Sequence, residues 1–126
     1  MSKTRNKVLI VDDDFISLEV LKAMIGHYPV DIVTAQTGQE AIQVALAEQP
    51  CLILLDHELP DFDGIEVYCR LKNELGDKVP PTVMVTGHQH GDFADRCAAA
   101  GINQQLHKPV QPQQLADLLR IASGIE

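Results

Sequence analysis

Acidic residues stand at the ends of two apolar runs in this 126-residue chain. VLIV runs directly into Asp12, Asp13 and Asp14, and LILL runs into Asp56. If Asp12, Asp13 and Asp56 converge, carboxylates about 4 Å apart repel each other by roughly 4 kcal/mol at an effective dielectric constant near 20. Such a cluster takes up a proton or binds a hard cation, and all-oxygen ligands suit Mg²⁺ or Mn²⁺ better than zinc.

Two further side chains could complete a site for phosphoryl chemistry. Thr86 ends a third apolar run and offers a hydroxyl, and Lys108 follows residues 104–107. Asp56 could attack phosphorus, bind a metal ion, or do both. An ammonium group and a hydroxyl opposite the cation would hold phosphoryl oxygens in the electrostatic clamp that phosphoryl transfer requires. Each residue alone has an ordinary structural explanation, so it is their joint placement that indicates this chemistry.

These residues can meet only if they lie at the ends of neighbouring strands. Unbroken runs of β-branched residues and leucine are typical of strands covered on both faces of a parallel sheet. They predict five strands, at residues 7–11, 30–35, 51–56, 81–86 and 104–107. Segments of helical length separate the strands, and this alternation predicts an α/β fold, an open, doubly wound five-stranded parallel sheet with helices on both faces.

In such a sheet, ligands bind at the carboxyl ends of the strands, where the strand order reverses. With the order 2-1-3-4-5 the first and third strands are neighbours, which would bring Asp12 and Asp13 to Asp56. Aspartate is also a favoured N-cap, and we expect Asp14 to have only that role. Apolar residues at helical spacing predict the first and last helices; they are Leu18, Leu21 and Ile25, then Leu115, Leu118, Leu119 and Ala122.

Length and composition narrow the class of protein. The chain has the size of one ordinary domain, which we expect to span residues 1–126. A net charge of −8 argues against nucleic acid or an anionic membrane surface as a partner. Three cysteines without CxxC spacing indicate neither a disulfide framework nor a zinc site, so we expect a cytoplasmic protein. No stretch approaches the roughly 20 apolar residues of a membrane span.

Four motifs together resemble a known family. VLIVDDDFIS, LLDHELPDFDGIEV, VMVTGH and LHKPV, in this order and at these separations, are similar to the receiver domains of two-component response regulators, including chemotaxis regulators. The resemblance covers essentially the whole chain and implies the flavodoxin-like (βα)5 fold. It implies that Asp56 accepts a phosphoryl group from a histidine kinase or a histidine phosphotransfer protein in a phosphorelay. Asp13, Asp56 and the backbone carbonyl of Glu58 would hold Mg²⁺, and Asp12 would act through water.

The same resemblance assigns a signalling role to the fourth and fifth strands. Thr86 and Lys108 would bind the phosphoryl group and report its presence, and the peptide bond between Lys108 and Pro109 would be cis. Members of the family usually carry Tyr or Phe three residues before the lysine, whereas this chain has Gln105. Because no ring can be buried behind Thr86, either the output is altered or the domain relays phosphate with little conformational readout.

Other residues near these motifs lead to smaller expectations. Glu58 and His88 stand two residues beyond Asp56 and Thr86, so they would flank the phosphoryl entrance and change the rate of dephosphorylation. His57 is expected to point away from the site because adjacent strand residues alternate faces. The thiols are expected to be buried or half-buried; they belong to Cys51, Cys69 and Cys97.

Other classes of function match the sequence less well. A haloacid-dehalogenase-type phosphatase would need a second Asp two residues after Asp56, where Glu58 stands, and usually a cap region. A flavodoxin-like electron carrier would need hydroxyls and amides after the first strand, because aspartates would repel the FMN phosphate. A degenerate receiver acting only as an interaction scaffold would keep Asp56 and Lys108 as relics. The sequence thus predicts a phosphoacceptor signalling domain, not a metabolic enzyme, that assists its own phosphorylation and hydrolysis. It leaves open whether this domain is free-standing or joined to an output or kinase domain.

Overall fold

A computed structural model describes residues 6–26, 28, 30–87, 93–102, 104–108 and 110–123. The strands are β1 (Asn6–Val11), β2 (Val30–Ala35), β3 (Leu52–Asp56), β4 (Thr82–Thr86) and β5 (Gln104–His107). The helices are α1 (Phe15–Ile25), α2 (Gly38–Glu48), α3 (Gly64–Leu75), the 3-10 turn η1 (Gly76–Lys78), α4 (Phe93–Ala100) and α5 (Pro112–Ser123). All five strands pair in parallel in the order β2-β1-β3-β4-β5, which confirms the predicted fold class and strand order.

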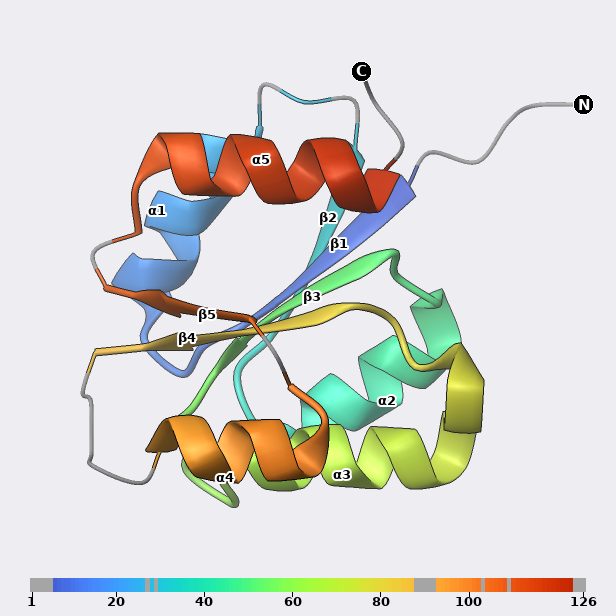
Figure 1. The fold of residues 1–126 in the computed structure, drawn as a ribbon. Coiled ribbons are helices and arrows are strands. Elements are labelled where there is room, and N and C mark those ends of the chain that lie inside the picture. The colour runs from blue at the N-terminus through green and yellow to red at the C-terminus, as the bar shows by residue number, and fades with distance from the viewer. Residues whose placement is uncertain are drawn as a thin grey trace, which may run out of the picture.

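The sheet is the middle of three layers. Figure 1 shows α1 and α5 on one face and α2, α3 and α4 on the other. Alternate residues of each strand point to opposite faces, so Val8 and Ile10 pack with α1 and α5 while Leu9 and Val11 pack with α2, α3 and α4. Because both faces are covered, the strands read in the sequence as unbroken apolar runs rather than as alternating ones.

The strand register gathers the polar ends of the strands at one edge of the sheet. Val11 pairs with Leu55, so Asp12 follows on beside Asp56. The backbone N–H of Asp12 donates to the carbonyl of Ala35 at 3.1 Å, which continues the ladder one residue past β1. In the same way the N–H of Lys108 donates to the carbonyl of Thr86 at 2.9 Å. Strand pairing alone therefore brings β1, β3, β4 and β5 to a common polar edge.

Local predictions agree with the structure at most positions. The strand ends differ from their predicted limits by no more than one residue. The apolar stripes of the first and last helices face the core as predicted, where the structure describes their side chains; these are Leu18, Leu21, Ile25, Leu115, Leu118 and Leu119. Within the described part of the chain, no helix is long and apolar enough to cross a membrane.

One prediction about the thiols is wrong. Cys97 is buried and Cys51 is half-buried, but Cys69 is exposed. Cys69 lies on the side of α3 that faces solvent, where it lines a groove together with Arg70 of the same helix. Cys69 directly follows the buried Tyr68, so it looks like a core residue in the sequence, although the helix turns it outward.

Candidate phosphoacceptor and metal site at the carboxyl edge of the sheet

Three carboxylates meet where β1 and β3 end. One oxygen from each of Asp12, Asp13 and Asp56 lies within 4.8 Å of the others. Asp12 and Asp56 are only 1% and 6% exposed, whereas Asp13 is open to solvent. A cluster of this kind holds two desolvated carboxylates and one that solvent reaches, so a cation could approach it from the side of Asp13.

The neighbouring Asp14 has a separate role. Its side chain caps α1 by accepting a hydrogen bond from the N–H of Ile16 at 3.2 Å. The hydroxyl of Ser17 donates to its other carboxylate oxygen at 3.1 Å. The N-cap that we predicted for Asp14 is therefore confirmed, and both of its carboxylate oxygens are engaged with α1.

Lys108 provides a positive charge at the cluster. Its Nζ lies 2.8 Å from Oδ2 of Asp12 and 3.6 Å from Oδ1 of Asp56. The N–H of Asp14 donates to the other oxygen of Asp12 at 2.9 Å, so Asp12 is held from both sides. Burial by itself would lower the pKa of Lys108, but the hydrogen bond to Asp12 and the charge of Asp56 outweigh it and raise that pKa. The ammonium group therefore stays charged.

Asp56 is only partly neutralised by this lysine. Burial raises the pKa of Asp56, the charge of Asp12 raises it further, and the result is about 7 although the charge of Lys108 opposes the shift. Asp13 adds to the increase, and a hydrogen bond with the backbone of Glu58 lessens it. A carboxyl group whose pKa is raised in this way resists ionisation, so a bound cation would favour its ionised form.

The remaining predicted residues lie at or near the same edge. Thr86 is buried at the end of β4, and Glu58 is exposed just beyond β3. Gln105 is half-buried on β5 and pairs with Met84, two residues before Thr86. His57 is buried, and its Nε2 lies 3.9 Å from Oδ2 of Asp63, the N-cap of α3. The predictions for His88 and for the peptide bond to Pro109 concern residues outside those that the structure describes.

Comparison with known proteins agrees with this geometry. The model of the response regulator receiver domain family matches residues 8–120. This chain is a receiver domain of that family. It is 31% identical over 122 residues to the probable transcriptional regulator ycf27 of Cyanophora paradoxa. The aligned region covers 95% of this chain and 49% of that protein. It is 29% identical over 119 residues to the signal transduction histidine-protein kinase BarA of Escherichia coli. The aligned region covers 94% of this chain and 13% of the kinase.

Solved receiver domains share the fold. The signal receiver domain of a putative Luxo repressor protein from Vibrio parahaemolyticus has a TM-score of 0.82 at 31% identity, covering 95% of this chain and 91% of that one. A CheY-like receiver domain protein from Methanospirillum hungatei has a TM-score of 0.86 at 26% identity, covering 96% of this chain and 95% of that one. The receiver domain thus spans about half the length of the ycf27 regulator and a small part of the kinase. The predicted resemblance to two-component receivers is confirmed.

A glycine of this receiver domain allows α3 to approach β3. The N–H of Gly64 donates to the carbonyl of His57 at 2.8 Å. A Cβ at Gly64 would lie 2.5 Å from the carbonyl oxygen of Asp56 and 2.9 Å from the sulfur of Met84. The sequence motif contains this glycine, but the reason for it, the close approach of α3 to the backbone of Asp56, becomes visible only in the fold.

The variant Gly64→Ala should lower the free energy of unfolding by about 1–3 kcal/mol, because the added methyl group forces α3 away from β3. Gly87→Ala is the matched control at the end of β4, where a Cβ would meet its nearest atom, Cδ of Lys108, at 4.0 Å. We expect the control to leave stability unchanged or slightly raised. Urea unfolding measures both, and equal losses in the two variants would contradict the steric explanation.

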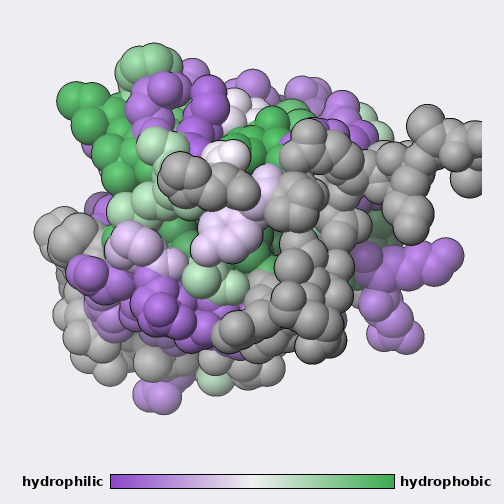
Figure 2. All heavy atoms as spheres, turned by 90° about the horizontal axis from the view of Figure 1, so that it is seen from above, coloured by the Kyte–Doolittle hydropathy of each residue, from purple (hydrophilic) through white to green (hydrophobic). Residues whose placement is uncertain are grey.

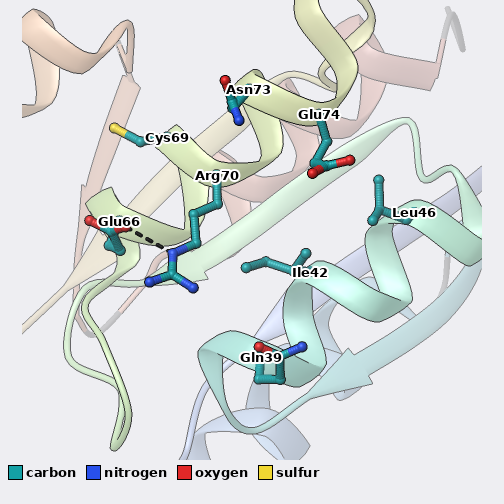
Figure 3. A pocket seen from close by; sticks show the side chains of 8 residues that line it. All are labelled: Gln39, Ile42, Leu46, Glu66, Cys69, Arg70, Asn73 and Glu74. Carbon is teal, nitrogen blue, oxygen red and sulfur yellow. Dashed lines mark hydrogen bonds and ion pairs between the residues drawn. The ribbon is translucent and has the colours of Figure 1, made fainter.

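Among the hollows beside the receiver's helices, two differ in their relation to the site. One, of about 420 Å³, shares Gly87 and Lys108 with the carboxylate edge and is otherwise lined mainly by α1. A second, of about 590 Å³, lies between α2 and α3, and none of the predicted site residues lines it (Figure 3). The hollow beside α1 is therefore continuous with the site, and the groove between α2 and α3 is separate from it.

Proposed function

We propose that this receiver domain accepts a phosphoryl group on Asp56 from phosphohistidine, with Mg²⁺ bound beside it. The observation that carries the proposal is a buried aspartate whose pKa is raised to about 7, with two more carboxylates within 4.8 Å and one ammonium group 3.6 Å away. Such an under-neutralised, all-oxygen cluster suits a hard divalent cation and an incoming phosphoryl group.

The donor set fits Mg²⁺. We assign Asp13, Asp56 and the backbone carbonyl of Glu58 as ligands and Asp12 as a residue that acts through water. Magnesium keeps several waters and takes few protein ligands, which agrees with the open side of the cluster at Asp13. When bound, the ion would neutralise negative charge on the phosphoryl oxygens and on the cluster.

The chemical step is a displacement at phosphorus. A carboxylate oxygen of Asp56 forms a bond to phosphorus while the bond from phosphorus to the histidine nitrogen breaks, and the imidazole leaves with a proton. The ammonium group of Lys108 and the hydroxyl of Thr86 would donate hydrogen bonds to the phosphoryl oxygens. Water later attacks the acyl phosphate, which releases phosphate and restores the carboxylate. The domain would thus assist its own phosphorylation and hydrolysis.

Phosphate incorporation tests this function. The protein is incubated with Mg²⁺ and acetyl phosphate, or with a phosphohistidine-bearing protein, and acyl phosphate is identified by its lability to hydroxylamine. We expect incorporation in the wild type and in Asp14→Asn, and none in Asp56→Asn. Incorporation that persists in Asp56→Asn would place the acceptor elsewhere, and a wild type inert toward both donors would favour a protein-interaction scaffold.

The switch assigned to Thr86 and Gln105 belongs to the same proposal. Without a ring on β5, we infer that phosphorylation is reported differently from the usual threonine and aromatic pair. Amide NMR with Mg²⁺ and beryllofluoride distinguishes the two forms of this idea. Shifts confined to the strand ends would mean relay with little readout, and shifts that spread into α4 and α5 would mean an altered output.

A phosphohistidine donor would dock beside α1. A protein that delivers a phosphoryl group to Asp56 must also cover the first turns of this helix, since α1 begins two residues after Asp13. Phe15, Ile16 and Val20 are 64%, 71% and 48% exposed there. Figure 2 looks down on the layer of α1 and α5 and shows hydrophobic atoms gathered toward one edge. Exposed apolar surface that adjoins a site is typical of protein interfaces.

The variant Ile16→Asp should reduce transfer from a phosphohistidine-bearing protein by about 10-fold, because interface anchors of this kind contribute about 1–2 kcal/mol. Its rate with acetyl phosphate should match the wild type, since the carboxylate edge is unchanged. Leu46→Asp is the matched control, because Leu46 is an exposed leucine on α2, on the other face of the sheet. An equal loss with both donors, or an equal loss in the control, would argue against docking at α1.

The receiver would work in the cytoplasm as one domain over residues 1–126. The relatives include a regulator about twice as long and a much longer kinase. We therefore propose two settings, a free-standing regulator and a receiver linked to an output or kinase domain. In both settings the downstream partner is a protein, and the net charge of −8 gives nucleic acid no favourable surface on this domain.

A further inference from the structure

A single carboxylate ties the loop between β3 and α3 to the start of α2. Oδ1 of Asp61 accepts a hydrogen bond from the N–H of Gly38 at 2.7 Å, and Oδ2 accepts one from the N–H of Gln39 at 2.9 Å. The N–H of Phe62 also donates to Oδ1, at 2.9 Å. Free N–H groups at a helix N-terminus need acceptors, and here a distant loop supplies the acceptor.

The carboxylate of Asp61 remains ionised in this arrangement. Burial acts to raise its pKa, but hydrogen bonds from the backbone of Gln39, Gly38 and Phe62 together lower it below the ordinary value. A negative charge at the N-terminus of α2 also interacts favourably with the helix dipole. The link from the loop to α2 is therefore a charged one at neutral pH.

Close packing accompanies this link. A Cβ at Gly38 would lie 2.6 Å from Cε2 of Phe62, so the ring rests directly on the backbone of α2. The guanidinium of Arg70 lies over the Phe62 ring, 4.2 Å from its centroid, and Nε of Arg70 donates a hydrogen bond to Oε2 of Glu66 at 2.8 Å. Figure 3 shows Arg70 reaching from α3 toward α2. Phe62 is thus held by residues of both helices.

The start of α2 also has a cap of its own. The hydroxyl of Thr37 accepts from the N–H of Glu40 at 3.0 Å, and the carboxylate of Glu40 accepts from the N–H of Gln36 at 2.9 Å. The pair differs from a capping box only in that Glu40 reaches the N–H of the residue before the N-cap, and it stabilises the helix end without any help from the loop. The bonds to Asp61 are therefore additional, and their distinctive effect is on the loop rather than on α2.

The loop carries the backbone carbonyl that the proposed metal site uses. Its two ends are fixed, because the N–H of His57 donates to the carbonyl of Val85 at 3.2 Å and the N–H of Gly64 donates to that of His57. In the sequence, Glu58 lies between the first of these ends, His57, and Asp61. Asp61 is the point where the middle of the loop is attached to another helix.

We propose that Asp61 is a positioning residue for the Mg²⁺ site, because it anchors to α2 the loop that presents the carbonyl of Glu58. This inference rests on the proposed function, since it requires that Mg²⁺ bind at the carboxylate edge. Asp61 itself does not touch the ion. Residues that hold a metal ligand in place commonly change metal affinity when they are replaced.

Mg²⁺ affinity measured by amide NMR titration, without any phosphodonor, tests the proposal. In Asp61→Ala the dissociation constant should rise about 10-fold, the lower end of the range for residues behind a ligand. Thr37→Ala is the matched control, because it removes a cap from the same helix end and leaves the loop attached. Its dissociation constant should stay within about twofold of the wild type. Thermal unfolding of each variant shows whether the fold is retained.

The possible outcomes separate the two proposals. If the wild type binds Mg²⁺ and Asp61→Ala binds it equally well, the positioning role is wrong while the proposed function stands. The same conclusion follows if Thr37→Ala weakens binding as much as Asp61→Ala, because the effect would then come from α2. If Asp61→Ala does not fold, Asp61→Asn, which keeps one acceptor oxygen, replaces it under the same criteria. A wild type that fails to bind Mg²⁺ would refute both proposals.

Discussion

Mg²⁺ should bind Asp13→Asn on the order of 100-fold more weakly than the wild type, because loss of a direct ligand should cost at least as much as loss of the groups behind it. Asp13 is the exposed member of the cluster, with an oxygen within 4.8 Å of those of Asp12 and Asp56. Calorimetric titration at constant ionic strength measures the dissociation constant directly.

Asp14→Asn provides a control of equal charge at the next position. Asp14 directs its carboxylate to Ile16 and Ser17 of α1, so its replacement should change Mg²⁺ affinity only slightly. The two variants have the same net charge, and any general electrostatic effect is common to both. Equal weakening in both would mean that Asp13 acts through its charge alone and not as a ligand.

In the absence of Mg²⁺, Asp56→Asn should be more stable than the wild type at pH 8 and should lose this advantage on acidification. Burial and the charge of Asp12 raise the pKa of Asp56 from 3.8 to about 7. The folded state therefore binds more protons than the unfolded state between these two values, and wild-type stability falls as the pH rises through that interval. Below pH 4 both states are protonated, so the ionisation makes no difference there.

The expected gain at pH 8 is about 1–3 kcal/mol, less than the full linkage value because solvent at the open edge screens the charges. Urea unfolding with EDTA present, at pH 5 and at pH 8, measures it. Asp61→Asn is a control in which the opposite effect is expected. The pKa of Asp61 is lowered, so its charge stabilises the fold at any pH above the ordinary pKa of an aspartate, and the variant should be less stable than the wild type at pH 8. A difference between wild type and Asp56→Asn that does not change with pH would rule out the linkage.

The sequence predicted the strands and the acidic cluster because both depend on local pattern. A strand buried on both faces must be apolar throughout, so its last residue is recognisable where charge begins, as at Asp12 and Asp56. Parallel pairing then brings those residues together without further information. Even the difference between Asp13 and Asp14 follows from helix capping, which is a local preference.

Contacts between distant segments could not be predicted in this way. The bonds from Asp61 to Gly38 and Gln39 depend on how the loop after β3 packs on α2, and no spacing in the sequence encodes it. The exposure of Cys69 depends on the rotation of α3 in the same manner. Gln105 was recognisable as a departure from the family, but its half-buried position on β5 depends on neighbouring strands and helices.

The position of Lys108 has a consequence for when the site comes into existence. Its contact with Asp12 joins residues 96 positions apart, and it requires β5, which is the last of the five strands of this sheet in the sequence. A nascent chain that has completed β1 and β3 already contains the aspartates but lacks the ammonium group that balances them. Because domains fold as units during synthesis, acceptor chemistry would begin only once the whole sheet has closed. A phosphorylated molecule would then be one in which all five strands of the sheet have been synthesised and paired.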